Sequence, residues 1–320
     1  MKILVTGAAG FIGSHTAEKL KTLGHDVLGL DCFSDYYNIE LKKLNAQTLL
    51  SQDISIKNID LKNLEDLFAL EKDFDFIFHF AAQPGISKDC SFEDYLDNNV
   101  IATQNLIQFA KSCNALQLFV NIATSSIYGL EAVLTEDDAP KPASYYGVTK
   151  LAAEQLVLAQ SREQKLKACS FRLFSVYGPR ERPDKLYTRL INSALNKQPF
   201  TLYKGSEKHL RSFTYVSDIV DGLISVFDKI AQVNGEVFNL GSEEENTTLE
   251  GIQTVERLTH NKIVIKETPP REGDQSRTWA NIEKAKRVLQ YQPKTSLEEG
   301  LKQHISWFEE NNIGQYLTAL

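Results

Sequence analysis

Residues 2–13 read KILVTGAAGFIG, and this stretch decides the fold. Its apolar run at residues 3–5 is typical of a short buried strand. Gly7, Gly10 and Gly13 follow at once. In a dinucleotide-binding turn, the first glycine permits the tight turn, the second lets backbone N–H groups approach a pyrophosphate, and the third lets the next helix pack close to the strand. The stretch therefore predicts a strand and a pyrophosphate-binding turn, with an ordinary glycine turn as the alternative.

The neighbouring sequence supplies the context for this interpretation. A helix-like run begins with Phe11 and Ile12, so the free N–H groups of its first turn face the candidate site. A second strand, HDVLGLD at residues 25–31, ends in Asp31. A carboxylate there accepts hydrogen bonds from an adenosine ribose and repels a 2′-phosphate, which favours NAD over NADP. An aspartate in a surface turn is the other interpretation, and the glycine spacing departs from the commonest fingerprint.

Strand and helix signals alternate along the first half of the chain. Strands are expected at residues 2–6, 26–30, 74–80, 117–122 and 167–173, and helices at 11–23, 61–70, 95–112 and 145–162. This alternation predicts a Rossmann-type, doubly wound α/β fold with a parallel sheet covered on both faces. Ligands in such folds bind at the carboxyl ends of the strands. Asp53 and Ile54 follow an apolar run at residues 48–50, and we expect them to meet the adenine.

Composition excludes several classes of function. The chain has 320 residues, enough for one or two domains, and its net charge of −7 argues against nucleic acid or an anionic membrane as the main partner. The N-terminal apolar run is too short for a signal peptide, and no run is long enough to span a bilayer. Four scattered cysteines form no C-x-x-C pair, which indicates no metal site and a reducing, cytoplasmic environment.

Two further strand ends carry candidate site residues. The segment FIFHFAAQ ends in Phe80, Ala81 and Ala82, and small residues there let the backbone lie close to a flat cofactor. His79 lies inside that strand, where a hydrogen-bonded core histidine is favoured over a catalytic one.

The next strand opens into Thr124, Ser125 and Ser126. These hydroxyls can hold the oxygen of a reacting alcohol. Their alternative role is to cap a helix or close a turn.

Tyr146 and Lys150 stand four residues apart in YGVTK, within an expected helix. That spacing places both side chains on one helical face. An ammonium near a phenol lowers the pKa of the tyrosine, which then acts as general acid or base on a sugar hydroxyl. A packing pair is the alternative, but the preceding glycine turn and hydroxyl cluster favour the catalytic interpretation.

The sequence pattern changes near residue 174, where a loop rich in proline, glycine and arginine is followed by shorter strand and helix signals. We expect residues 1–174 to form an NAD-binding domain and residues 175–320 a smaller mixed α/β substrate lobe, with part of the chain returning to the first domain around 212–242. Four arginines lie near loop signals: Arg180, Arg182, Arg211 and Arg271. They are candidates to bind a diphosphate through bidentate hydrogen bonds, and each is also compatible with a solvated surface charge.

Together these motifs resemble the extended short-chain dehydrogenase/reductase family, in its nucleotide-sugar epimerase/dehydratase branch. The resemblance covers nearly the whole chain. Its motifs are TGAAGFIG (6–13), HFAAQ (79–83), YLDNNV (95–100), ATSSIYG (123–129), YYGVTK (145–150), FRLFSVYGPRERPD (171–184), RSFTYVSDI (211–219), FNLGS (238–242), REGD (271–274) and YQPKTSLEEGLK (291–302).

The resemblance implies roles for individual residues. Tyr146 is the acid/base at the sugar C4 hydroxyl, Thr124 shares the C4 oxygen, and Lys150 holds the nicotinamide ribose. Asn98 and the Ala81–Ala82 turn contact NAD. Arg211 and Arg271 hold the diphosphate, Asp274 the uridine ribose, and residues 198–203 border the base. The family often forms homodimers through the helices expected at 95–112 and 145–162.

Departures from the family patterns narrow the activity. Dehydratases carry Asp-Glu where this chain has Ser125 and Ser126, which argues against dehydration and for C4 epimerisation of a UDP-sugar. Ser175 and Arg182 resemble the UDP-glucuronate 4-epimerases, where a hydroxyl and an arginine receive the C5 carboxylate. Ser87, where relatives of that group often have arginine, does not fit. UDP-glucose/UDP-galactose epimerisation, a decarboxylase or dehydratase on the same scaffold, and a catalytically idle NAD-binding regulator remain as alternatives.

Overall fold

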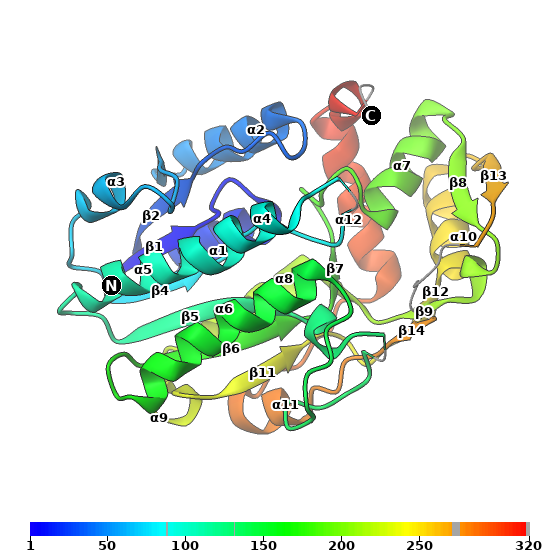
Figure 1. Ribbon diagram of the computed structural model, residues 1–320. Helices are drawn as coiled ribbons and strands as arrows, with labels where there is room; N and C mark the ends of the chain where they lie inside the picture. The colour runs from blue at the N-terminus through cyan, green and yellow to red at the C-terminus, as the bar shows by residue number, and fades with distance from the viewer. Residues whose placement is uncertain (88, 131, 271–275, 318–320) are drawn as a thin grey trace.

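A seven-stranded parallel sheet forms the centre of the molecule (Figure 1). The structure is a computed structural model and describes residues 1–87, 89–130, 132–270 and 276–317. Its strand order is β11-β6-β5-β4-β1-β2-β3. The strands are β1 (Lys2–Thr6), β2 (Asp26–Asp31), β3 (Ser55–Asn58), β4 (Phe76–His79), β5 (Leu118–Thr124), β6 (Ala168–Leu173) and β11 (Val237–Leu240). The reversal of strand order between β1 and β4 is the switch point at which doubly wound sheets bind their ligands.

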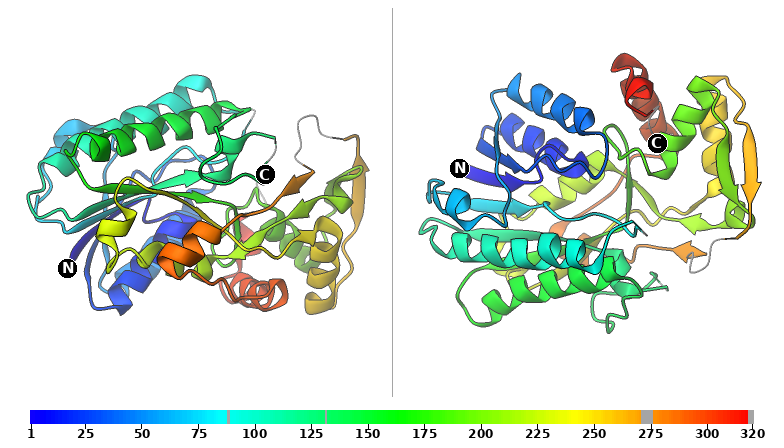
Figure 2. Two further views of the ribbon diagram at one scale, coloured as in Figure 1. Left: turned by 90° about the horizontal axis from the view of Figure 1, so that it is seen from below. Right: turned by 45° about the horizontal axis from the view of Figure 1, so that its top comes forward.

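Helices cover both faces of the sheet, so the molecule has three layers (Figure 2). On one face lie α3 (Leu64–Phe68), α4 (Phe92–Tyr95), η1 (Leu96–Ile101), α5 (Ala102–Lys111) and α6 (Tyr145–Arg162). The other face carries α1 (Phe11–Thr22), α2 (Ile39–Leu50), α8 (Val216–Ile224) and α11 (Glu283–Leu289). This arrangement confirms the predicted Rossmann-type fold.

The predicted element pattern misses α2 and β3. Residues 48–50, which read as an isolated apolar run, are the end of α2. The buried side of α2 includes Lys42 and Asn45, so the helix lacks the continuous apolar stripe by which an amphipathic helix is recognised. The sequence of β3, SIKN, is short and mostly exposed at the sheet edge.

A smaller lobe lies beside the carboxyl ends of the sheet strands (Figure 1). Three small sheets form it, pairing β10 with β7, β9 with β12 and β14, and β8 with β13. Its strands are β7 (Ser175–Tyr177), β8 (Phe200–Tyr203), β9 (Leu210–Arg211), β10 (Phe213–Tyr215), β12 (Asn246–Thr247), β13 (Ile265–Thr268) and β14 (Arg277–Thr278). Its helices are α7 (Leu186–Asn196), η3 (Ser206–Lys208), α10 (Thr248–Thr259), α12 (Leu297–Glu310) and η4 (Ile313–Tyr316), and a short α9 (Ile230–Val233) precedes β11.

Buried aromatic rings pack where the chain passes between the sheet and the smaller lobe. Tyr177 contacts Tyr187, Phe213 and Tyr215 at ring-centroid distances of 5.1, 6.4 and 5.7 Å. Such ring pairs add stability beyond the area they bury. Within the described ranges, no helix has the length and apolar character needed to cross a membrane.

Candidate active site

The glycine turn after β1 is shaped for close backbone approach. Gly7 has φ of +69°, and a Cβ there would lie 2.8 Å from the amide nitrogen of Ala81. A Cβ on Gly13 would lie 2.3 Å from the carbonyl oxygen of Gly7. Gly10 caps α1 without any side-chain hydrogen bond, so the first-turn N–H groups of Phe11 and Ile12 face the turn. This cradle fits a pyrophosphate, because a helix N-terminus attracts anions and glycine leaves room for them.

Asp31 ends β2 beside this turn and is only 7% exposed. Its carboxylate accepts hydrogen bonds from the backbone N–H groups of Ala9 at 3.1 Å and Phe33 at 2.8 Å. Asp31 therefore stabilises the glycine turn through its hydrogen bond with Ala9. It also lies at the strand end where a ribose is expected.

Two polar residues of α2 that the sequence analysis missed complete this corner. The ammonium of Lys42 donates to the carbonyl and hydroxyl oxygens of Ser34, and the side-chain amide of Asn45 donates to the carbonyl of Ala9. Both side chains are buried although both are polar, and that combination is the signal that identifies them once α2 is known.

The expectation that Asp53 and Ile54 meet the adenine is wrong. In the register of β2 with β3, Asp31 lies opposite Asn58, so the carboxyl end of β3 is at residue 58. Asp53 and Ile54 precede β3 and lie at the opposite edge of the sheet, where Ile54 is fully buried. Ile59 follows β3 at the ligand edge and donates its N–H to the carbonyl of Asp31 at 3.1 Å.

Phe80, Ala81 and Ala82 follow β4 at the switch point and are all partly exposed. The Ala81 N–H donates to the Thr6 hydroxyl at 3.2 Å, which lies 2.8 Å from Nδ1 of His79. Burial and the charge of Lys150 lower the pKa of His79 to about 3. His79 is thus a neutral core residue, as the sequence favours.

Asn99, rather than the expected Asn98, reaches the turn after β4. The Asn98 amide donates to the carbonyl of Asp94, within its own helical segment. Asn99 is 1% exposed; its carbonyl accepts from the Gln83 N–H at 2.8 Å and its amide donates to the Thr149 hydroxyl at 3.0 Å. These asparagines lie in the π-helical segment η1, whose wider turn changes which residue faces inward.

The Thr124 hydroxyl and the Tyr146 phenol face one another between β5 and α6. Tyr146 lies in the first turn of α6, which the Ser144 hydroxyl caps through the Gly147 N–H at 3.1 Å. Burial raises the pKa of Tyr146, while its contact with Thr124, the charge of Arg182 and the Gly85 N–H lower it. Burial is the largest of these effects, so the pKa of the phenol lies above its ordinary value, and Arg182 supplies a positive charge that favours the phenolate.

Lys150 lies one helical turn beyond Tyr146 on α6 and is 4% exposed. Burial lowers the pKa of its ammonium to about 8, and the carboxylate of Glu154 acts in the opposite direction. Glu154 is itself held by a two-pronged ion pair with Arg172, at 3.0 and 2.7 Å.

Ser125 and Ser126 follow Thr124 in the short 3₁₀ helix η2 (Ser125–Tyr128) and are partly exposed. The Ser126 N–H donates to the Thr124 hydroxyl at 3.2 Å, so this hydroxyl both caps η2 and faces Tyr146. Ser175 begins β7, also partly exposed. The hydroxyl cluster predicted from the sequence thus lies at the carboxyl end of β5, and Ser175 follows the carboxyl end of β6.

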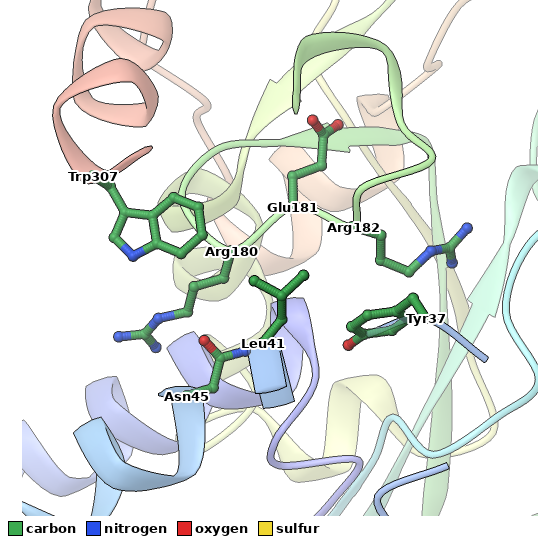
Figure 3. A pocket seen from close by; sticks show the side chains of 7 residues that line it. All are labelled: Tyr37, Leu41, Asn45, Arg180, Glu181, Arg182 and Trp307. Atoms are coloured by element: carbon green, nitrogen blue, oxygen red, sulfur yellow. The ribbon is translucent and has the colours of Figure 1, made fainter. Parts of the chain in front are cut away.

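The loop between β7 and α7 sends its two arginines in opposite directions (Figure 3). Arg182 lies beside Gly85, where a Cβ would be 2.8 Å from Nη2, and over the Tyr36 ring. Its Nε and Nη2 donate to the carboxylate of Asp184 at 2.9 and 2.8 Å. Arg182 is close enough to Tyr146 for its charge to affect that phenol, and its guanidinium is already paired with the carboxylate of Asp184.

The other arginines have different surroundings. Arg180, one of the four candidate arginines, makes a bidentate ion pair with Glu18 of α1, so its guanidinium is already engaged within the protein. Arg211 lies in β9 and donates from Nη1 to the carbonyl of Leu210 at 3.1 Å. Arg271 and Asp274, expected at the diphosphate and the uridine ribose, lie outside the described residues.

A family model for the NAD dependent epimerase/dehydratase family matches residues 3–241 of the chain.

The chain belongs to this family.

Its curated relatives extend the likeness over nearly the whole sequence. An uncharacterized UDP-glucose epimerase of Bacillus subtilis (strain 168), YtcB, is 38% identical over 98% of this chain and 100% of its own length. The UDP-glucuronate 4-epimerase 2 of Arabidopsis thaliana is 33% identical over 96% of this chain and 76% of its own length.

A crystal structure extends the likeness to three dimensions. The UDP-glucuronic acid 4-epimerase from Bacillus cereus, in complex with UDP-glucuronic acid and NAD, superposes with a TM-score of 0.90. It is 36% identical in sequence and the match covers 97% of this chain and all of that one. As a member of the NAD dependent epimerase/dehydratase family, the protein uses NAD, and the glycine cradle, Asp31 and the turn after β4 are the parts of the chain whose shape fits it.

Proposed function

We propose that the protein catalyses NAD-dependent C4 epimerisation of a UDP-sugar through a transient 4-keto sugar, with UDP-glucuronate and UDP-galacturonate as the pair. The observation that carries the proposal is the meeting of Thr124, Tyr146 and Arg182 at the carboxyl edge of the sheet. Support comes also from relatives whose names are UDP-glucuronate 4-epimerase or UDP-glucose epimerase.

In the proposed mechanism, Tyr146 takes the proton of the C4 hydroxyl and later returns one. Thr124 accepts or donates a hydrogen bond at the same oxygen and so fixes it against the phenol. NAD, when bound, supplies the acceptor and donor of the C4 hydride. Lys150 binds the nicotinamide ribose, and the Ala81–Ala82 turn lies against the cofactor. Presenting the other face of the keto sugar before the hydride returns inverts C4 and leaves the cofactor unchanged over one cycle.

Ser125 and Ser126 favour epimerisation over dehydration. A dehydratase needs a general acid and a general base to remove the C5 proton and the C6 hydroxyl. Serine hydroxyls do not serve as general acids or bases near neutral pH without an activating partner. These residues therefore favour the return of hydride to C4 over dehydration of the keto sugar.

Arg182 and Ser175 support the uronate as the substrate. A guanidinium holds a carboxylate through parallel, charge-assisted hydrogen bonds, and a neutral hydroxymethyl group cannot replace them. Asp184 occupies Nε and Nη2 of Arg182 in the free protein, so the sugar carboxylate either meets Nη1 or exchanges with Asp184. Against the uronate stand Ser87 and the name of YtcB, a UDP-glucose epimerase, and we keep the neutral hexose pair as the second candidate.

A decarboxylase and an idle regulator are the remaining alternatives. A 4-keto uronic acid is a β-keto acid, and it loses CO₂ readily when its carboxylate stands perpendicular to the ketone plane. Arg182 holding the carboxylate nearer that plane keeps it intact until hydride returns. A decarboxylase would give a product lighter by CO₂, whereas a regulator would copurify with NAD and show no turnover.

The test is to incubate the native protein and Arg182→Ala with UDP-glucuronate and with UDP-glucose, and to resolve products by chromatography and mass. We expect Arg182→Ala to lose roughly ten- to a hundredfold in kcat/KM on the uronate, since charge-assisted hydrogen bonds contribute about 1.5–3 kcal/mol. The loss on UDP-glucose should be much smaller. Equal losses on both sugars, or a native enzyme that turns over only neutral sugars, would contradict the uronate proposal.

Domain roles, assembly and location complete the proposal. Residues 1–174 bind NAD and residues 175–320 bind the nucleotide sugar, with the chain around 212–242 returning to the first part. Arg211, Arg271 and Asp274 contact the UDP moiety.

The protein forms a homodimer through α5 and α6, on a face where Phe92, Ile101, Tyr145 and Val148 are 37–60% exposed. Four free cysteines are compatible with a reducing cytoplasm.

A further inference from the structure

Three consecutive residues of the loop between β7 and α7 point in three directions. Arg180 turns toward α1, Glu181 toward α7, and Arg182 toward the candidate active site (Figure 3). Within the loop, the Arg182 guanidinium pairs with the Asp184 carboxylate and the Arg182 carbonyl accepts from the Lys185 N–H at 3.1 Å; outside it, Arg182 contacts Tyr36 and Gly85. Its position in the site therefore depends on what holds Arg180 and Glu181.

Helix α1 holds the first part of this loop. Nη1 and Nη2 of Arg180 donate to the two carboxylate oxygens of Glu18 at 2.8 and 2.9 Å, and the side chains are 9% and 19% exposed. His15, one turn earlier on α1, lies with Nε2 2.9 Å from the carbonyl oxygen of Pro179. Because a carbonyl oxygen can only accept, Nε2 of His15 is the donor.

Helix α7 holds the next residue. The carboxyl group of Glu181 accepts from the backbone N–H of Thr188 at 2.9 Å and from its hydroxyl at 3.0 Å, and Glu181 is 5% exposed. The backbone of Arg180 has φ of +68°, a region that L-residues adopt rarely. Contacts on both sides are what keep the loop in this conformation.

The Arg180–Glu18 ion pair has a defined geometry, because both nitrogens of the guanidinium fork donate to the carboxylate. A lysine would supply the same charge, but only the planar guanidinium matches a carboxylate in two parallel bonds and so fixes direction as well as distance. The pair also joins the sugar-facing loop to α1, whose first turn is the phosphate cradle.

We propose that Arg180, held by Glu18, is a positioning residue that sets selectivity for a C5 carboxylate by fixing Arg182 in the site. This inference rests on the proposed uronate 4-epimerase function. When the pair is loosened, the loop relaxes from its rare backbone conformation and the Arg182 guanidinium shifts away from Tyr146. Selectivity between sugars then falls, while the nucleotide half of the substrate binds as before.

The test compares Arg180→Lys, Glu18→Gln and the double variant with the native protein. The exposed pair Arg257–Glu298 is the matched control, because it is also two-pronged, at 2.6 and 3.1 Å, and joins α10 to α12 outside this loop. The first readout is the ratio of kcat/KM for UDP-glucuronate to that for UDP-glucose. The second is calorimetric affinity for UDP-glucuronate and for UDP, measured with Tyr146→Phe added to each protein so that the sugar does not turn over.

We expect the kcat/KM ratio to fall about tenfold in Arg180→Lys and in Glu18→Gln, since displacing a positioning group by ~1 Å costs up to ~100-fold. The double variant should fall no further, because the two residues act as one unit. Affinity for UDP-glucuronate should approach that for UDP, whose own affinity stays at the native value. Arg257→Lys should change neither readout.

An unchanged ratio in folded Arg180→Lys and Glu18→Gln, alongside a lowered ratio in Arg182→Ala, would overturn the inference and leave the proposed function standing. Equal losses on both sugars would also overturn it, since they indicate a purely structural pair. A native protein that does not turn over UDP-glucuronate would overturn the proposed function, and this inference with it. If Arg180→Lys does not fold, Glu18→Gln alone decides, because it keeps an acceptor for Arg180.

Discussion

Burial and the neighbouring groups shift the pKa of Tyr146 in opposite directions. Burial raises the pKa of the phenol, and Thr124, Arg182 and the Gly85 N–H lower it. A general acid/base must give up and regain its proton within each cycle, so the groups that favour the phenolate are those on which catalysis depends. In the free protein, these groups come from three separate segments of the chain.

We expect Tyr146→Phe to lower turnover roughly a hundredfold or more, the usual range for losing a general acid/base. Phenylalanine keeps the ring and removes only the proton-carrying oxygen. UDP affinity should survive, because the proposed UDP contacts lie in the smaller lobe. Steady-state kinetics and calorimetry measure the two effects, and a near-native rate would remove this tyrosine from the mechanism.

Lys150 gives a prediction for stability against pH. Its pKa is about 8 in the folded protein against an ordinary 10.5, so between these values the unfolded chain binds more protons than the folded one. The contribution of Lys150 to the free energy of unfolding therefore rises with pH from about 8 to 10.5. We expect ligand-free Lys150→Met to be more stable than the native protein near pH 7, and this advantage to shrink across that window.

Denaturant unfolding at several pH values measures the difference. Lys266→Met is the control, because Lys266 is exposed on β13 and its substitution should give a much smaller pH-dependent difference. A constant difference between Lys150→Met and the native protein from pH 7 to 10.5 would contradict a lowered pKa.

At the scale of elements, the sequence predicts best what depends on neighbouring residues. The turn at Gly7–Gly13, the strand end at Thr124 and the Tyr146–Lys150 spacing all follow from local patterns, and the structure has these elements. Helix α2 is missed because Lys42 and Asn45 interrupt its apolar face, and their burial is explained only by tertiary partners, Ser34 and Ala9.

The expectations that failed depend on information beyond local pattern. Choosing Asn98 over Asn99 assumes a regular helix, whereas η1 is π-helical. Placing Asp53 at the adenine assumes a strand before it, whereas the strand follows it. The ion pair of Arg180 with Glu18 joins residues 162 positions apart, and no periodicity in the sequence indicates such a partner.

The glycine turn gives a prediction about a single methyl group. In Gly13→Ala the added Cβ would lie 2.3 Å from the Gly7 carbonyl oxygen, so α1 must move away from β1. We expect the native protein to retain NAD on purification, and Gly13→Ala to lose it together with about 2–3 kcal/mol of stability, the upper range for overpacking. Thermal unfolding and the absorbance of the released nucleotide measure these effects.

Gly24→Ala is the control for that substitution. Gly24 has φ of +83°, but a Cβ there meets nothing within 4 Å, so it isolates the conformational cost of about 1 kcal/mol. NAD should stay bound in this variant. If Gly13→Ala is no less stable than Gly24→Ala and retains NAD, close helix–strand packing is not what the third glycine provides.

At the scale of the whole molecule, α6 has one face that lines the candidate active site and another that is exposed. Its inner face carries Lys150 and Glu154, both buried, while Tyr145 and Val148 are 60% and 44% exposed. The Tyr145 ring meets the Phe92 ring at 5.2 Å, which joins the exposed apolar side chains of α6 to those of α4. The proposed dimer face and the proposed catalytic tyrosine therefore lie on the same helix.

We therefore expect the native protein to be a dimer in solution and Val148→Glu to be a monomer, because a carboxylate facing its own copy across a twofold axis is desolvated and repelled. Light scattering coupled to size-exclusion chromatography measures the mass. Val264→Glu is the control, since Val264 is 60% exposed in the smaller lobe, away from this face, and its substitution should leave the mass unchanged. Because Val148 lies only two residues from Tyr146, the Val148→Glu monomer should also lose turnover while retaining affinity for UDP. A native monomer, or a Val148→Glu protein that stays dimeric, would mean that the exposed face of α6 is not where two copies meet.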